Sequence, residues 1–227
     1  MIEIQFPDQS VRAFKKGVTP LEIAQSISEG LARNVLSVKV NGNVLEARTP
    51  IMEDGIINLL TWNDKEGKAA FWHSSAHILA QSLISLYPQA KLTIGPAIEN
   101  GFYYDVDFGE ASFSEKDLPA LEKQFMTFAR EKFEFKMRMS TKSDALKFYK
   151  NENNPYKVEL VENLEDGTIS FCDHANFTDL CRGGHIPHTG FIKAVKLLSV
   201  AGAYWRGDET KPQLTRIYGI SFPKQKE

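Results

Sequence analysis

Cysteine is scarce in this chain of 227 residues, which contains only Cys172 and Cys181. Two cysteines are too few for a disulfide framework, and this scarcity is typical of a protein kept in a reducing cytoplasm. The chain also lacks any run of ~18 consecutive apolar residues, so the sequence predicts no membrane span. The first ten residues, MIEIQFPDQS, have neither a basic segment nor an apolar core, and we therefore expect no secretory signal.

An excess of charge of one sign is absent as well. The 27 Lys and Arg residues oppose 29 Asp and Glu residues, which gives a formal net charge of −2. Bulk charge therefore does not indicate nucleic-acid binding, and a nucleic-acid partner would need a local basic surface. The composition, 42% apolar and 25% charged, is that of an ordinary globular protein with one large or two small domains.

Residues 1–62 have the pattern of a small unit of their own. Two alternating segments around the turn PDQS predict a β-hairpin. A helix then begins with Thr19 as N-cap, Pro20 at the first helical position and Glu22 completing a capping box. Three more strand-like segments follow, two of them joined by the turn NGN. The order strand–strand–helix–strand–strand–strand predicts a ubiquitin-like β-grasp domain.

A second, larger unit is expected at residues 71–224. Residues 63–70 are polar and contain glycine, which predicts a linker between the two units. The second unit begins with a helix and continues with a strand, an Asn-Gly turn and an aromatic strand. Its longest helical pattern follows Ser114, and Pro119 indicates that this helix starts late or bends. Two shorter helices and three strands complete an α+β pattern with an antiparallel sheet, and residues 177–190 are expected to be a loop.

Two histidines are the first candidates for a catalytic or metal-binding site. His73 and His77 are four residues apart and share one face of the first predicted helix of the larger unit. The metalloprotease pattern requires a glutamate directly after the first histidine, and Ser74 at that position excludes it. Cys181 and His185 repeat the same spacing. Three imidazoles and one thiolate are ligands that zinc prefers, so these four residues could hold a metal.

The residues alone leave the type of site open. If all four side chains bound zinc, the site would be closed and structural, whereas a hydrolytic zinc needs a position for water. Without a metal, a histidine would take a proton from water and a lysine would stabilise the developing negative charge. We expect Cys172 to pack as a small apolar residue, and His174 and His188 to be surface polar groups.

Five segments follow the β-grasp unit in order: HSSAHILAQSL, IGPAIENGFYYDV, YKVEL, DLCRGGHI, and AGAYWRGDE with LTRIYG. Together they resemble the N-terminal region of bacterial-type threonyl-tRNA synthetases, over essentially the whole chain. The resemblance implies that residues 1–62 are a TGS domain and that residues 71–224 are a tRNA editing domain. It further implies that residues 225–227 begin a linker to an aminoacylation core whose ATP-binding motifs are not found here.

The resemblance implies hydrolysis of serine wrongly esterified to threonine tRNA. Serine is one methyl group smaller than threonine, so a threonine pocket discriminates against it by only ~1–3 kcal/mol, and a second site is needed. This second site must leave no room for the methyl group of threonine. The implied catalytic residues are His73, His77, Lys157, Asp179 and His185, and the implied substrate-binding residues are Tyr104 and Cys181.

The roles implied for these residues follow from their chemistry. We expect His73 to act as the base or to orient the water, and Lys157 to stabilise charge on the carbonyl or ribose oxygens. Asp179 would receive the seryl ammonium group. The remaining groups would orient the water and the terminal ribose: His77 and His185, with Cys181 in support.

Cofactors and partners also follow from the resemblance. A related editing fold in alanyl-tRNA synthetases carries zinc on such a motif, so zinc could bind here, whereas ATP and the core zinc would bind outside this chain. The implied partners are the acceptor stem and 3′ end of threonine tRNA, in a cytoplasmic enzyme that is a homodimer as a whole and a monomer as this fragment. Gly184 stands where many relatives have proline, so we expect a looser loop.

Two other functions stay open. The larger unit could be a non-catalytic module that holds the acceptor stem through Lys and Arg contacts to phosphates. It could also be a structural zinc domain, which a chelator would unfold. Loss of His73 would abolish hydrolysis but would leave phosphate contacts in place, so this substitution separates an enzyme from a binding module.

Overall fold

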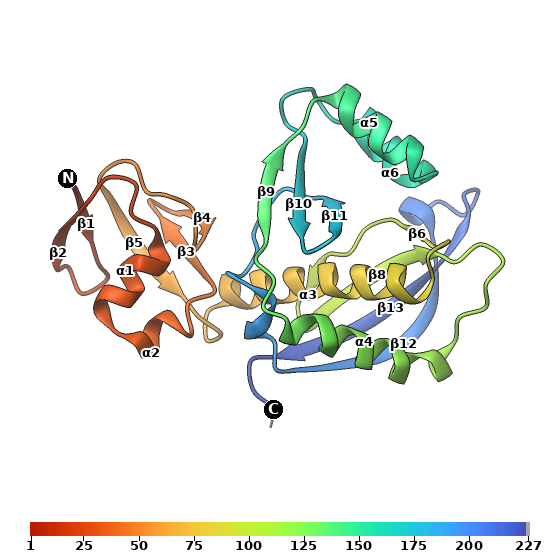
Figure 1. The fold of residues 1–227 in the computed structure, drawn as a ribbon, viewed down its shortest axis with the longest axis horizontal. Helices are drawn as coiled ribbons and strands as arrows, with labels where there is room; N and C mark the ends of the chain where they lie inside the picture. Colours follow the sequence, from red (N-terminus) through yellow and green to blue (C-terminus); the bar gives the residue numbers. More distant parts are fainter. Residues whose placement is uncertain (226–227) are drawn as a thin grey trace.

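The first unit of the chain is a five-stranded sheet crossed by one helix (Figure 1). The computed structural model describes residues 1–225. In the first unit the strand order is β2-β1-β5-β3-β4, and the neighbouring strands β1 and β5 run parallel. This is the predicted β-grasp. Its elements are β1 (Ile2–Gln5), β2 (Val11–Phe14), α1 (Pro20–Ile27), α2 (Glu29–Ala32), β3 (Ser37–Val40), β4 (Asn43–Glu46) and β5 (Gly55–Leu60).

Helix α1 begins where the sequence predicts. The Thr19 side chain accepts a hydrogen bond from the Glu22 backbone N–H, and the Glu22 carboxylate accepts one from the Thr19 N–H. These two bonds satisfy donors that a helix start leaves open. The apolar face of α1 then buries Ile23 in the core of the sheet beside Ile4 and Ile57.

The connection between the two units is shorter than the linker predicted at residues 63–70. Only four residues separate the end of β5 from helix α3 (Lys65–Leu86), so residues 65–70 are already helical. Asp64 closes the turn by accepting a hydrogen bond from the Thr61 N–H at 2.7 Å. Gly67 then packs directly on the Thr61 carbonyl, which only a residue without Cβ allows.

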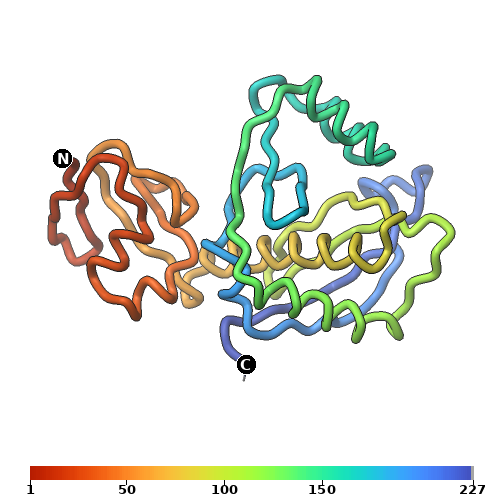
Figure 2. Tube along the Cα trace, in the orientation of Figure 1, coloured from red at the N-terminus to blue at the C-terminus, as the bar shows by residue number. Residues whose placement is uncertain are grey.

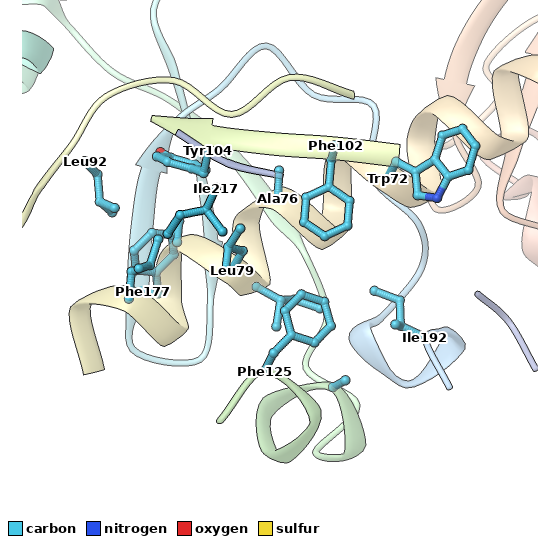
Figure 3. Packing of buried hydrophobic residues seen from close by; sticks show 14 of the residues in the cluster. Trp72, Ala76, Leu79, Leu92, Phe102, Tyr104, Phe125, Phe177, Ile192 and Ile217 are labelled. Carbon is cyan, nitrogen blue, oxygen red and sulfur yellow. The ribbon is translucent and has the colours of Figure 1, made fainter. Parts of the chain in front are cut away.

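Helix α3 is the centre of the second unit and packs against its larger sheet. Figure 3 shows Ala76 and Leu79 of α3 close to Phe102 and Ile217 of the sheet, with Phe125 of α4 nearby. The sheet order is β12-β13-β8-β6. The elements of this layer are β6 (Lys91–Leu92), β7 (Ala97–Ile98), β8 (Gly101–Asp107), α4 (Leu118–Arg130), β12 (Ala194–Tyr204) and β13 (Gln213–Phe222), with single turns of 3-10 helix at Glu115–Asp117, Thr189–Phe191 and Trp205–Gly207.

Helix α4 starts late, as Pro119 predicts. Ser114 caps the short 3-10 turn, and the α-helix itself begins at Leu118. The prediction that this helix is the longest was wrong, because α3 has 22 residues and α4 has 13. The polar residues before His73, which predict a linker, form the first turns of α3.

A smaller sheet and two helices complete the second unit. The sheet order is β11-β10-β9, and all neighbours are antiparallel. The first part of the loop predicted at residues 177–190 is in fact strand β11, whose four residues are too few to show a clear period of two. The elements are β9 (Lys136–Met139), α5 (Lys142–Asn151), α6 (Pro155–Glu162), β10 (Ser170–His174) and β11 (Phe177–Leu180).

The end of the last strand returns to the junction of the two units (Figure 2). Trp62, in the connection, packs its ring on Phe222 with centroids 6.0 Å apart. The Trp72 indole N–H donates to the Ser221 carbonyl at 3.1 Å. Of the predicted linker start at 225–227, the last two residues lie outside the described part of the chain. Within that part, no helix has the length and apolar character needed to cross a membrane.

We predict that Gly67→Ala destabilises the protein, although alanine favours a helix over glycine by ~1 kcal/mol. A Cβ at Gly67 would lie 2.0 Å from the Thr61 carbonyl oxygen, so the connection would have to move. We expect a net loss of ~1–3 kcal/mol in the free energy of unfolding, measured with denaturant. Gly30→Ala in α2 is the control, because its Cβ would meet only the Ser28 Oγ at 3.9 Å. Equal stability changes in the two variants would contradict the argument.

Candidate active site

The two histidine pairs predicted from spacing meet in space. His73 and His77 lie one turn apart on α3, and the chain after β11 brings Cys181 and His185 to them. The nitrogen and sulfur atoms that these four residues offer lie within 4.8 Å of one another. The Cys181 Sγ is 3.1 Å from the His73 Nε2 and 3.3 Å from the His185 Nε2.

Contacts with neighbouring imidazoles favour the thiolate form of the sulfur at the centre of this His/Cys cluster. Burial by itself raises the pKa of Cys181, but hydrogen bonds from His185 and His73, with a further contribution from His77, lower that pKa to about 2. A thiolate only accepts hydrogen bonds, so the His73 Nε2 must carry a proton and donate it. The Nδ1 atom of His73 is then the basic nitrogen of that ring.

His185 is held in a single orientation by a residue of the β-grasp unit. Its Nδ1 lies 2.7 Å from the carboxylate Oε1 of Glu46, at the end of β4. Burial opposes a charge on the ring, but hydrogen bonds with Cys172, Cys181 and Glu46 raise the pKa of His185 well above its ordinary value. The His185 ring therefore lies with its Nδ1 toward the Glu46 carboxylate and its Nε2 toward the Cys181 sulfur.

His77 is different, because it is neutral and unpaired. Burial lowers the pKa of its ring, which is 4% exposed. Neither ring nitrogen has a hydrogen-bond partner within residues 1–225, and the Nδ1 lies 3.7 Å from the Asp179 Oδ2. A buried, unpartnered imidazole is costly for a fold to keep, and such groups are often found where a ligand binds.

A buried ion pair lies beside the His/Cys cluster. The Asp179 Oδ1, on β11, accepts hydrogen bonds from the Lys157 Nζ at 2.5 Å and from the Leu180 N–H at 2.8 Å. The Tyr104 hydroxyl donates to the Asp179 Oδ2 at 2.8 Å. Both Lys157 and Asp179 are 3% exposed, so each charge depends on these partners. Asn154 caps α6 by accepting from the Lys157 backbone N–H, which places the lysine in the first turn of that helix.

These two groups line one cavity of about 780 Å³, the size of a small-molecule site. The wall opposite them is the segment Thr93–Ala97, in which Gly95 closes on the Tyr104 ring. A Cβ at Gly95 would lie 2.1 Å from that ring, so the residue has to be glycine. Val44 of the β-grasp unit also lines the cavity. The polar lining residues include His73, His77, Lys157, Asp179 and Cys181 together with the charged Glu66 and Arg182, and the apolar ones include Leu160, Leu164 and Leu180.

The donor set of the His/Cys cluster fits zinc. Three imidazoles and one thiolate are among the usual ligand combinations, and their atoms are already gathered. The orphaned nitrogens of His77 support this fit, because a metal would give one of them a partner. Three of the four residues, His73, His77 and Cys181, line the cavity, and His185 is not among its lining residues.

All seven residues singled out in the sequence lie at this site, but some expectations about their neighbours were wrong. His174, expected at the surface, is buried at 2% exposure, and its ring packs on Phe135 and Phe177. Burial and the nearby His77 and His185 lower its pKa to about 3. His188 is half-buried. Cys172 packs in the core, as predicted.

Two features of the loop after Cys181 were not foreseen. Gly184, expected to loosen this loop, has a φ of +93°, and its N–H donates to the Glu46 Oε1 at 3.1 Å. A proline could neither adopt this φ nor donate this bond. Glu46 itself was missed, because it precedes His185 by 139 residues and no local pattern marks it.

Comparison with known proteins finds a matching domain model in each of the two units. A TGS domain model matches residues 2–61, and a model described as the threonyl and alanyl tRNA synthetase second additional domain matches residues 169–218. Threonine–tRNA ligases from Flavobacterium johnsoniae and Cytophaga hutchinsonii are 63% and 57% identical to the chain over all 227 residues. The chain spans 35% of the length of each of these relatives.

We predict that Cys181 reacts as a thiolate far into the acidic range. A free cysteine loses reactivity below its pKa of ~8.5, whereas a pKa of about 2 keeps Cys181 ionised throughout. In metal-free protein, the rate of Cys181 alkylation by iodoacetamide should therefore stay nearly constant as the pH falls from ~8 to ~5. Burial raises the pKa of Cys172, so a Cys172→Ser variant should give the same profile. A tenfold or greater loss of rate over this range would contradict the assignment.

We also predict that Lys157 and Asp179 are strongly coupled. Lys157→Met leaves a buried carboxylate without its cation and should reduce the free energy of unfolding by about 3 kcal/mol. Adding Asp179→Asn to the same protein should reduce this loss, because the unpaired charge is gone. The half-exposed pair Lys39–Glu66 is the control, and Lys39→Met should change stability little. Additive effects in the double variant would show that the pair is not coupled.

Proposed function

Because the chain corresponds to the TGS and second-additional-domain region of threonyl-tRNA synthetases, we propose that residues 71–224 are an editing domain. In this proposal the domain hydrolyses the ester that joins serine to threonine tRNA, and the whole enzyme serves protein biosynthesis. The observation that supports it most is the cavity in which an imidazole–thiolate cluster faces a buried carboxylate–ammonium pair. Such a cavity offers both a base and charge stabilisation for ester hydrolysis.

The carboxylate of Asp179 has room for one more donor. A carboxylate has about four acceptor positions, and Lys157, Leu180 and Tyr104 occupy three of them. The remaining position is on the Oδ2, toward the unpaired ring of His77. The α-ammonium group of an aminoacyl ester would bind there, which agrees with the role that the sequence suggests for Asp179.

His73 is the residue best suited to take a proton from water. Its Nε2–H donates to the Cys181 thiolate, so its Nδ1 keeps a lone pair, and it lines the cavity. In the first step, water oxygen forms a bond to the ester carbonyl carbon as His73 Nδ1 takes the water proton. The carbon–oxygen bond to the ribose then breaks, and the ribose oxygen takes the proton back from His73.

Lys157 would stabilise the negative oxygen that forms in the first step. Its ammonium group has three N–H donors, of which one is used by Asp179. The group is buried, so its charge acts on a developing oxyanion with less screening than at the surface. In this proposal the wall where Gly95 packs on the Tyr104 ring distinguishes serine from threonine by leaving no room for the added methyl group.

Zinc held by three of the residues His73, His77, Cys181 and His185 would keep one position open and would supply a Lewis acid to the cavity. ATP and the core zinc would bind in other parts of the enzyme. The proposed partners are the acceptor stem and 3′ end of threonine tRNA, in the cytoplasm. We further propose that the whole enzyme is a homodimer and that this part of it is a monomer.

The proposal predicts selective deacylation. With the chain in large excess over tRNA, seryl ester on threonine tRNA should be hydrolysed and threonyl ester spared. His73→Ala should lower the rate by ~10²-fold or more, because it removes the base. The half-buried His188, which is not a lining residue of the cavity, provides the control variant His188→Ala, which should keep the wild-type rate. A chelator-treated sample shows whether a metal contributes.

Two results would count against the proposal. If the chain binds the tRNA but hydrolyses neither ester, it is a binding module that contacts phosphates. If chelator unfolds the chain and His73→Ala does the same, the His/Cys cluster is a structural zinc site.

A further inference from the structure

One oxygen atom of the β-grasp unit organises the loop that carries half of the His/Cys cluster. The Glu46 Oε1 accepts three hydrogen bonds, two from the backbone N–H groups of Gly184 and His185, each at 3.1 Å, and one from the His185 Nδ1 at 2.7 Å. The His185 side chain has no exposed surface, and the Glu46 side chain is 20% exposed. The Glu46 carboxylate therefore lies where the two units meet, and its Oε1 accepts hydrogen bonds from the second unit.

The hydrogen bond between Glu46 and His185 fixes which nitrogen of the His185 ring faces the Cys181 sulfur. A carboxylate can only accept, so the proton at this contact must be on the His185 Nδ1. The ring is then turned so that its Nε2 points to the Cys181 Sγ, 3.3 Å away. A carboxylate behind a histidine in this way fixes the tautomer and the orientation of the ring, whether its other nitrogen meets a thiolate or a metal.

A second contact joins the same two segments without touching the His/Cys cluster. The Arg48 guanidinium pairs with the Glu134 carboxylate at 2.8 Å and donates to the Pro187 carbonyl at 3.4 Å. Both Arg48 and Glu46 belong to the segment at the end of β4, and both hold the loop after Cys181. The chain thus contains one contact that orients His185 and a neighbouring contact that only docks the units.

We propose that Glu46 is a positioning residue for His185, so that the β-grasp unit completes the active site of the second unit. The catalytic part of this inference rests on the proposed ester hydrolysis, whereas the fixed tautomer of His185 does not. Removing such a carboxylate partner of a histidine typically costs 10–100-fold in activity or metal affinity, roughly, and we expect a loss of that order here.

The test uses two substitutions at one position. Glu46→Ala removes all three hydrogen bonds, whereas Glu46→Gln keeps an amide oxygen that can accept them. In single-turnover deacylation, Glu46→Ala should slow the hydrolysis step by ~10–100-fold with unchanged tRNA affinity, and Glu46→Gln should recover most of the rate. In ¹⁵N NMR spectra of the imidazole, the Nδ1–H form of His185 should be lost in the Ala variant and kept in the Gln variant.

Two controls separate positioning from general docking. Glu53→Ala removes an exposed carboxylate of the same unit and should change neither readout. Arg48→Ala weakens the contact between the units and should leave the His185 tautomer unchanged, with a smaller loss of rate than Glu46→Ala. The inference is overturned if Glu46→Ala keeps both the His185 tautomer and the deacylation rate of the wild type. It is also overturned if Arg48→Ala changes the tautomer and the rate as much as Glu46→Ala does. If wild type does not hydrolyse seryl ester, the proposed function fails, and the NMR spectra still decide the positioning.

Discussion

The carboxylate of Asp179 must be neutralised where it lies, and this requirement shapes the second unit. Three elements contribute to it: α6 brings Lys157, β8 brings Tyr104, and β11 provides the next backbone N–H. The small sheet and the larger sheet are therefore joined at a charged group and not only by apolar packing. Leaving that charge unpaired would cost several kcal/mol, so the geometry of the cavity follows from the geometry of the pair.

The charges around the cavity have a consequence for what can bind. Along its lining, the cations Lys157 and Arg182 are matched by the carboxylates Asp179 and Glu66. The lining thus has no excess of charged side chains of one sign, and the chain as a whole is nearly neutral. A bound ammonium group would therefore depend on direct contact with the Asp179 carboxylate.

What the sequence could predict depended on how local each feature is. The capping box of α1, the late start of α4 and the pairing of residues at i and i+4 are set by neighbours in the chain, and the structure confirms the elements built on them. Strand β11 and the contact of Glu46 with His185 depend on residues far apart in sequence, which no periodicity reveals. His174 was misjudged because its burial is decided by the rings of Phe135 and Phe177 around it, not by its own polarity.

The residues of the His/Cys cluster are synthesised at different times. His73 is synthesised 108 residues before Cys181. The two histidines of α3 therefore have no Cys181 to contact until most of the second unit has been synthesised. Until then the nascent chain lacks a complete set of ligands for a metal ion. The site can therefore be assembled only after the turn that follows β11 has been synthesised.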